Sequence, residues 1–503
     1  MTASYCISSG KKDYICTQKA KMKKTMTHKR RKSSVCHVGP LAIGGDNPIR
    51  VQSMATVDTN DTEGCVAQAR RIIDAGGELV RFTTQGQREA QNMANISRRL
   101  KDDGYRQPLV ADVHFNALVA DVAACHCEKV RINPGNYVDP ARTFKHLEYT
   151  DEEYRQELRR LDERLVAFIG ICRQHGTAVR IGVNHGSLSD RIMSRYGDTP
   201  AGIVESCMEF LRIFRRESFS DVVISIKASN TVVMVQSVRL LVQQMDSEDM
   251  HYPLHLGVTE AGEGEDGRIK SALGIGALLT EGTGDTIRVS LSEEPECEIP
   301  VARKIVDLIP ECTRLREEAE GQLSDGPKEV PPAITDTTEA AVISGDTLTL
   351  TLDAPDWETL QLKAAMAAGA LLIDRKATKL TIRAERFTRS ALVSLSDAIL
   401  QAARIKFTKT EYISCPGCGR TLYNLQDTIQ RIKAATSHLV GLKIGIMGCI
   451  VNGPGEMADA DYGYVGAGRG KISLYRGKEC VQKSIPEEEA VDKLLALIQA
   501  DAH

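Results

Sequence analysis

The stretch Ala178-Val-Arg-Ile-Gly-Val-Asn184 is a short apolar run, typical of a buried β-strand, that ends in a polar residue. Seven similar runs occur between residues 45 and 295, at 48–54, 78–84, 108–113, 129–133, 221–227, 253–259 and 285–291. Segments with helical apolar spacing lie between them, at 61–75, 199–216 and 232–245, and the charged segment 150–164 is predicted to be an extra surface helix. Strands that alternate with helices indicate a parallel sheet, and eight such units predict a (β/α)8 TIM barrel over residues 36–310.

Residues 311–404 are predicted to be a linker followed by a small α/β insert. The stretch 311–332 is charged and then proline-rich, as linkers are. The insert carries no group of residues with an evident catalytic role, so it is expected to be a spacer. Its expected elements are a strand at 346–352, a helix at 356–368 and a second strand at 370–373; those of the C-terminal region 405–503 are a helix near 425–435, a strand at 443–447 and a terminal helix at 486–498.

The C-terminal region contains the most distinctive motif of the chain. Cys415-Pro-Gly-Cys418 is followed by Cys449, which lies in the glycine-rich run 448–456. Thiolates are the usual ligands of iron–sulfur clusters, so three cysteines can hold three irons of a cubane, and Glu456 is the nearest candidate for the fourth. A structural zinc site is the alternative, but zinc ribbons usually carry a second C-x-x-C or a histidine pair. The pattern favours a [4Fe-4S] cluster in a C-terminal α+β domain.

Composition limits the remaining possibilities. No apolar run reaches the roughly 20 residues that a bilayer span needs, and no signal peptide is evident. Fourteen cysteines without an export signal indicate reduced thiols and a cytoplasmic protein. Residues 1–35 carry ten Lys or Arg and one Asp, and they are expected to be a disordered basic extension. Because the rest of the chain is acidic, neither a nucleic-acid nor a membrane partner is expected.

Polar residues recur at the carboxyl ends of the predicted barrel strands, where catalytic groups of such barrels lie. Arginine forks match phosphate oxygens at two points, and several arginines with a lysine indicate two phosphates. Some of these arginines could instead form structural ion pairs with Asp112 and Glu260. Glu260 is expected to be ionised among the cations and placed to exchange a proton. His255 lies in an apolar strand and is equally compatible with a core position. The candidate residues are Arg81, Asp112, Arg131, Asn136, Arg180, Asn184, Lys227, Ser229, His255, Glu260, Arg288 and Ser290.

Barrel and C-terminal region together resemble the 4-hydroxy-3-methylbut-2-en-1-yl diphosphate synthase family. The resemblance covers about residues 30–310 and 405–500. The form resembled has a shortened insert between the barrel and the cluster domain, since some members have no insert and others a much larger one. The matching segments are 50–54, 110–115, 130–136, 180–184, 226–229, 255–262 and 284–290 in the barrel, and 415–418 and 448–456 in the C-terminal region.

The resemblance implies an iron–sulfur oxidoreductase of the methylerythritol phosphate route to isoprenoids. Such an enzyme reductively opens 2-C-methyl-D-erythritol 2,4-cyclodiphosphate and removes water, using two electrons from reduced ferredoxin or flavodoxin. Cys415, Cys418, Cys449 and Glu456 would hold the [4Fe-4S] cluster, with Glu456 leaving when substrate arrives, and Glu260 would donate a proton. The diphosphate contacts would be Arg81, Arg131, Arg180, Asn184, Lys227 and Ser290.

The family is dimeric, and in its two-domain members the cluster domain of one chain closes the barrel of the other. Because this chain has an insert, the resemblance leaves open whether its barrel is closed by its own cluster domain or by that of the partner chain. Two other functions compete with the enzyme. An iron–sulfur electron carrier or scaffold would not need cations on five barrel strands, and a pterin-binding barrel transferase would leave the cysteines unexplained.

Overall fold

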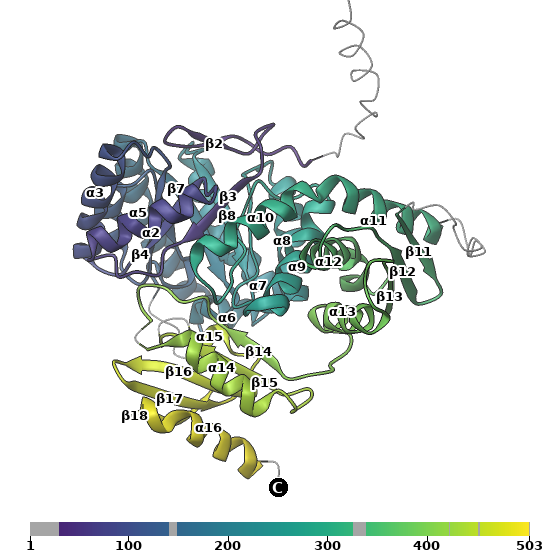
Figure 1. Cartoon of the computed structure of the whole chain (residues 1–503). Coiled ribbons are helices and arrows are strands. Elements are labelled where there is room, and N and C mark those ends of the chain that lie inside the picture. Colours follow the sequence, from purple (N-terminus) through teal and green to yellow (C-terminus); the bar gives the residue numbers. More distant parts are fainter. Residues whose placement is uncertain (1–29, 140–147, 325–338, 422, 451–452, 502–503) are drawn as a thin grey trace, which may run out of the picture.

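The computed structural model describes residues 30–139, 148–324, 339–421, 423–450 and 453–501. A barrel, an insert beside it and a C-terminal domain across one end of the barrel make up the molecule (Figure 1). Eight parallel strands form one sheet in the order β8-β7-β6-β5-β4-β3-β10-β9, and a parallel bridge between Ile224 and Leu254 joins its two edges. The predicted TIM barrel is confirmed. Its strands are β3 (Arg50–Met54), β4 (Leu79–Thr84), β5 (Leu109–Val113), β6 (Lys129–Ile132), β7 (Ala178–Asn184), β8 (Val222–Lys227), β9 (His255–Leu256) and β10 (Thr286–Ile287).

Helices cover the outside of the barrel. The long α5 (Asp151–His175) corrects the expectation of an extra surface helix at 150–164. That charged segment is the first part of the crossover helix between β6 and β7, and its Tyr154 and Leu161 are buried on the same face as Phe168. The other helices of this part are α2 (Thr62–Asp74), α3 (Gln87–Asp102), α4 (Ala117–Ala124), α6 (Asp190–Tyr196), α7 (Pro200–Arg216), α8 (Thr231–Ser247), α9 (Gly264–Thr280) and α10 (Glu298–Asp307), with single turns η1 (Pro134–Asn136), η2 (His185–Ser187) and η3 (Pro295–Cys297).

A small hairpin closes the amino-terminal end of the barrel. Strands β1 (Cys36–Val38) and β2 (Leu41–Ile43) pair antiparallel. Their buried side chains pack against the lowest inward-facing layer of the barrel, which includes Leu79 and Val110. Most of the predicted basic extension lies outside the described residues, but Arg30 donates to the Asn47 carbonyl at 2.6 Å and Arg31 to the Tyr252 carbonyl at 3.1 Å. The chain therefore contacts the barrel before residue 36, from Arg30 onward.

The insert is built onto the barrel rather than separated from it. Residues expected to be a linker form the helix α11 (Ile309–Ser324), whose Cys312, Leu315 and Ala319 are buried at helical spacing. A three-stranded sheet follows, with β11 (Ala340–Ser344), β12 (Thr347–Thr351) and β13 (Lys379–Arg383), and with helices α12 (Trp357–Ile373) and α13 (Arg389–Ala402).

The expected strand at 370–373 is wrong, because these residues are the last turn of α12. The helix is buried on every side from Leu360 onward, so its apolar run is continuous and periodicity alone cannot distinguish it from a strand. Helix α12 lies directly against α9 of the barrel (Figure 1). An added Cβ on Gly276 would lie 2.5 Å from Met366 Cγ, so the two helices approach closely. The insert and the barrel share one hydrophobic core.

The C-terminal domain places a five-stranded sheet at the carboxyl ends of the barrel strands (Figure 1). Its order is β14-β15-β16-β17-β18, with the first three strands parallel. The predicted helix, strand and terminal helix are confirmed. The elements are β14 (Glu411–Ser414), α14 (Leu425–Thr436), β15 (Lys443–Met447), α15 (Gly453–Glu456), β16 (Tyr462–Gly468), β17 (Lys471–Arg476), β18 (Glu479–Pro486) and α16 (Glu487–Asp501). None of the described helices combines the length and apolar character needed to cross a bilayer.

Lys129 is a buried cation without a partner in the described part of the chain. It lies two residues before Arg131 on the same inward-facing side of β6, and its Nζ makes no hydrogen bond. Burial, and then the neighbouring Arg180, lower the pKa of Lys129 from 10.5 to about 7. The unfolded chain therefore binds one more proton between these two pH values, so the free energy of unfolding should rise with pH across that window.

We predict that Lys129→Met stabilises the protein at pH 7 by the order of a few kcal/mol, because lowering a pKa by one corresponds to about 1.4 kcal/mol. The gain should shrink as the pH approaches 10, because the lysine is then neutral in the folded protein and increasingly so in the unfolded chain. Denaturant unfolding at pH 7 and 9.5 measures this, with the exposed Lys471→Met as the matched control. A gain that is equal at both pH values would contradict the prediction.

Candidate active site

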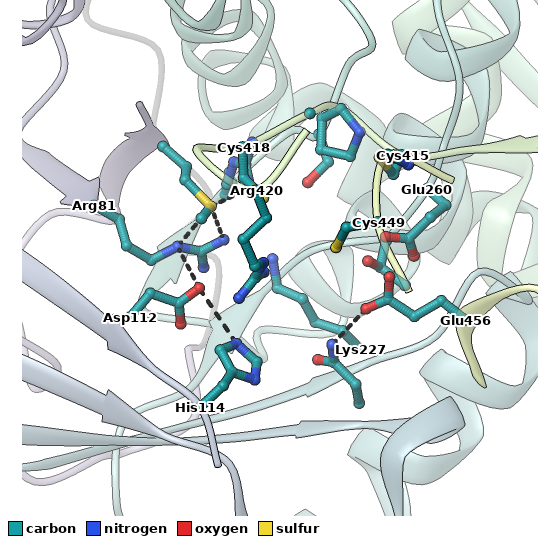
Figure 2. A pocket seen from close by; sticks show the side chains of 18 of the residues that line it. Arg81, Asp112, His114, Lys227, Glu260, Cys415, Cys418, Arg420, Cys449 and Glu456 are labelled. Atoms are coloured by element: carbon teal, nitrogen blue, oxygen red, sulfur yellow. Dashed lines mark hydrogen bonds and ion pairs between the residues drawn. The ribbon is translucent and has the colours of Figure 1, made fainter. Parts of the chain in front are cut away.

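The candidate site is a pocket between the mouth of the barrel and the C-terminal domain (Figure 2). Its empty space amounts to about 690 Å³. Both walls come from the same chain, so in this structure the barrel is closed by its own C-terminal domain. The lining residues include eight of the predicted substrate contacts and all of the predicted cluster ligands: Arg81, Asp112, Arg131, Arg180, Asn184, Lys227, Arg288 and Ser290, and Cys415, Cys418, Cys449 and Glu456.

Asp112 at the end of β5 partly balances the arginines of the neighbouring strands. It accepts from Arg131 Nη1 at 3.1 Å and lies 3.7 Å from Arg81 Nε. Burial acts to raise the pKa of Asp112, but these two guanidinium groups hold it well below its ordinary value. Arg131 also donates to the Gly182 carbonyl at 2.8 Å and contacts His114. The structure contains the ion pairing of Asp112 that the sequence left open as an alternative to a substrate contact, and this pairing fixes Arg131 in place.

Arg288 is neutralised by a carboxylate that the sequence did not reveal. Its Nε and Nη2 donate to the two oxygens of Glu298 at 3.0 and 2.8 Å, and both side chains are buried. Glu298 begins α10, and nothing in the local sequence distinguishes it from other acidic residues near the surface. Ser53 Oγ also donates to Glu298, at 2.6 Å. Arg288 is therefore held rigidly at the edge of the pocket.

Arg180 and Lys227 add positive charge to the pocket, and Asp112, 4.0 Å from Arg180 Nη2, offsets it only in part. Arg180 is 1% exposed, and its Nε and Nη1 have no hydrogen-bond partner among the described residues. Burial, and then Arg81 and Arg131, lower its pKa well below the ordinary value. Burial, and then Arg81, Arg288 and Arg180, lower the pKa of Lys227 well below its ordinary value. Buried donors without partners are costly, and two donor atoms of Arg180 lie beside a pocket that has room for an acceptor.

The three cysteines lie on loops that leave the carboxyl ends of adjacent parallel strands. Cys415 follows β14 and Cys449 follows β15, so the fold brings them to one edge of the sheet. Gly448 donates its backbone N–H to Cys415 Sγ at 3.3 Å, as expected for a sulfur that carries negative charge. Ser292 Oγ donates to the Cys415 carbonyl at 3.0 Å and ties this loop to the barrel.

Three cysteines and a glutamate that line one pocket are a donor set that a cubane cluster can use. Within the described ranges no three His, Cys, Asp or Glu side chains converge on one ion. The ligands of a cubane each bind a different iron, so they surround a space instead of meeting at a point. Cys415, Cys418, Cys449 and Glu456 all line the same pocket. The residues present therefore fit the cluster that the sequence predicts.

Glu456 lies where the two domains meet. Asn184 at the end of β7 donates to Glu456 Oε1 at 2.6 Å and accepts from Arg131 Nη2 at 3.4 Å. Beside Glu456, Gly455 of the C-terminal domain packs against Gly186 of the barrel. A Cβ added to Gly455 would be 1.9 Å from the Gly186 carbonyl oxygen. The carboxylate is thus held by a barrel side chain that also positions an arginine.

Glu260 corrects the expectation of an ionised carboxylate. Burial, and then the neighbouring Glu456, raise its pKa well above the ordinary value. Its φ of 49° lies in the left-handed region, which non-glycine residues seldom adopt. Ala261 beside it pairs with Ser414 of β14, so the strained loop is held by the strand that carries the cysteines. A protonated carboxyl at this position can donate to a bound molecule.

Three predicted substrate contacts do not line the pocket. Asn136 accepts from the Phe115 backbone N–H at 3.4 Å and supports the loop after β5. Ser229 donates to the Glu456 carbonyl at 3.3 Å, behind the pocket. His255 lies inside the barrel with Nδ1 3.4 Å from Thr286 Oγ1, so the core alternative describes it better.

Arg420 is a lining residue that the sequence reasoning missed. It follows the second cysteine of Cys415-Pro-Gly-Cys418 by two positions, and a charged residue so near a cluster loop was the available signal. Its side chain points from the cysteine loop into the pocket (Figure 2). Burial acts to lower the pKa of Arg420, but Cys418, Cys449 and Asp112 raise it above the ordinary value.

The fold and the site define a (β/α)8 barrel protein with an anion-binding mouth that a three-cysteine domain covers. Residues 33–303 match the family model described as the GcpE TIM-barrel domain, and residues 411–500 match the GcpE protein C-terminal domain. The chain belongs to the GcpE family.

Several curated relatives match nearly the whole chain, and they share one name. A 4-hydroxy-3-methylbut-2-en-1-yl diphosphate synthase (flavodoxin) from Bacteroides fragilis is 51% identical, over 94% of this chain and 96% of its own. Proteins of the same name from Bacteroides thetaiotaomicron and Leptospira interrogans are 51% and 37% identical, each over 94% of this chain and over 98% and 97% of their own. The alignment with the first runs over 602 positions, more than the 503 residues of this chain, so that relative has residues that this chain lacks.

We predict that Gly455→Ala separates the two walls of the pocket, because its Cβ has no room beside Gly186. Hydrogen exchange should become faster in α15 and η2, and turnover should fall by about 100-fold, as for a displacement of about 1 Å at an active site. Gly468→Ala is the control, since its Cβ would meet only Lys471 Cβ, at 3.9 Å. Unchanged exchange in α15 with Gly455→Ala would show that the contact is dispensable.

Proposed function

We propose that this protein is a 4-hydroxy-3-methylbut-2-en-1-yl diphosphate synthase. It reductively opens 2-C-methyl-D-erythritol 2,4-cyclodiphosphate and removes water to give 4-hydroxy-3-methylbut-2-enyl diphosphate. The observation that carries this proposal is the excess of buried cations in a pocket that also contains the cysteines. Asp112 only partly offsets Arg180, whose Nε and Nη1 have no hydrogen-bond partner among the described residues, and together with Lys227 this arginine suits the two phosphates of a cyclic diphosphate.

The chemistry is divided between the two walls of the pocket. A [4Fe-4S] cluster held by Cys415, Cys418, Cys449 and Glu456 would supply the two electrons when bound. The barrel arginines and Lys227 bind and orient the diphosphate. Glu260 holds a proton at the end of a strained loop, facing Glu456, and delivers it to the leaving oxygen. Asn184 forms hydrogen bonds with both Glu456 and Arg131, so it links the two walls of the pocket.

Flavodoxin is the electron donor that this proposal favours over ferredoxin, because the relatives carry it in their names. One chain supplies both walls of the pocket, so exchange of C-terminal domains within a homodimer is not needed to complete the site. An electron carrier or scaffold has no use for a cationic barrel mouth. A pterin-binding transferase has no use for the cysteines that line the same space.

The function is tested by anaerobic turnover of the cyclic diphosphate with reduced flavodoxin. Addition of the substrate should change the visible and paramagnetic spectra of the reconstituted protein. If the protein contains the cluster but neither binds nor consumes the cyclic diphosphate, the proposed function is wrong.

Arg180→Met should weaken binding of the cyclic diphosphate. The lost charge-assisted contact is worth roughly 1.5–3 kcal/mol, which corresponds to about 10- to 150-fold in affinity. Calorimetric titration on the anaerobic protein measures the change, and iron content should stay the same. Lys129→Met is the matched control, because it removes a buried cation of the same barrel that does not line the pocket. Equal affinity in Arg180→Met and in the unaltered protein would refute the anion site there.

Cys449→Ala should lose the cluster, since only two thiolates remain, whereas Glu456→Cys should keep it and lose nearly all turnover. A carboxylate binds iron more weakly than a thiolate in a soft site, so a fourth thiolate closes the position that substrate needs. Iron content and turnover are measured on the same anaerobic preparations. Cys480→Ala, in β18 and outside the pocket, should keep both. Normal turnover in Glu456→Cys, or intact cluster in Cys449→Ala, would contradict the ligand set.

A further inference from the structure

Arg420 is a buried cation that the C-terminal domain presents to the barrel. It is 9% exposed, and its Nε and Nη1 have no hydrogen-bond partner in the part of the chain that the structure describes. It lines the same pocket as Arg131 and His114 of the barrel, so its guanidinium lies across the domain boundary from these groups.

The nearby carboxylates already have other partners. Asp112 accepts from Arg131, Glu298 accepts from Arg288, and Glu456 accepts from Asn184. Cys418, Cys449 and Asp112 attract the charge of Arg420, but its two buried donor atoms without hydrogen bonds remain costly to the folded protein. Arg420 and Arg180 line the same pocket, and each has two buried donor atoms without a hydrogen-bond partner among the described residues. The two arginines approach that space from opposite walls.

We propose that Arg420 binds the diphosphate of the substrate from the side of the C-terminal domain, opposite the barrel arginines. The inference rests on the proposed function and deepens it. The substrate anion then neutralises cations of both domains at once. Binding therefore holds the C-terminal domain against the barrel, in addition to the contact between Gly186 and Gly455. Without the anion, Arg420 and Arg131 repel each other across the boundary.

The test compares Arg420→Met and Arg420→Lys with Arg431→Met, which removes an exposed arginine of the same domain. Calorimetric titration of the anaerobic holoprotein with the cyclic diphosphate should show about a 10- to 150-fold loss of affinity in Arg420→Met. Arg420→Lys should lose less, because it keeps the charge but not the two-point fork. Arg431→Met should bind normally. Iron content and the paramagnetic spectrum of the substrate-free protein should be unchanged in all three.

Hydrogen exchange supplies a second readout that does not depend on turnover. In the unaltered protein the cyclic diphosphate should slow exchange in η2 and α15, and this protection should be lost in Arg420→Met at saturating substrate. Equal affinity and equal protection in Arg420→Met would overturn the proposal. Loss of iron or an altered spectrum with normal affinity would also overturn it, because Arg420 would then serve the cysteines. Failure of the unaltered protein to bind the cyclic diphosphate would instead refute the proposed function.

Discussion

Mutual repulsion among the cations at the barrel mouth is the constraint on which the site depends. Arg81, Arg180 and Lys227 are buried within one pocket, and each lowers the pKa of its neighbours or has its own lowered by them. Asp112 and Glu298 offset part of this repulsion. The remainder is tolerated because the barrel and its shared core with the insert provide the stability, and because an anion completes the arrangement. Affinity for a doubly charged substrate follows from a folded state that is locally unfavourable without it.

The second constraint is that two sets of parallel strands end at the same place. The carboxyl ends of the barrel strands face the carboxyl ends of β14 and β15, so cationic loops meet cysteine loops. The contact between Ala261 and Ser414 and the bond from Ser292 to the Cys415 carbonyl keep the loops in register. Glu260, whose pKa is raised by burial and by Glu456, belongs to this boundary. The residues proposed to bind the anion, to donate the proton and to hold the cluster therefore line one pocket.

The sequence predicted the barrel, and it singled out three cysteines and a glutamate that the fold brings to one pocket, because both signals depend on local patterns. Short apolar strands with polar ends repeat eight times, and thiolates at that spacing serve few purposes. It failed where long-range burial decides the outcome. The apolar end of α12 was predicted to be a strand, because the nearby sequence does not show that α9 covers this part of the helix. Glu298 and Arg420 were missed because their roles come from residues of other elements. The ionisation of Glu260 was misjudged because Glu456 approaches only in the folded chain.

The hairpin of β1 and β2 makes the barrel blind at its amino-terminal end, with Cys36, Val38 and Ile43 packed against its lowest layer. Substrate and product must then enter and leave the pocket along the boundary between the barrel and the C-terminal domain. A product that keeps both phosphates would leave by the route by which the substrate entered. Substrate and product therefore use the same route, so that release of one must precede binding of the other in each cycle.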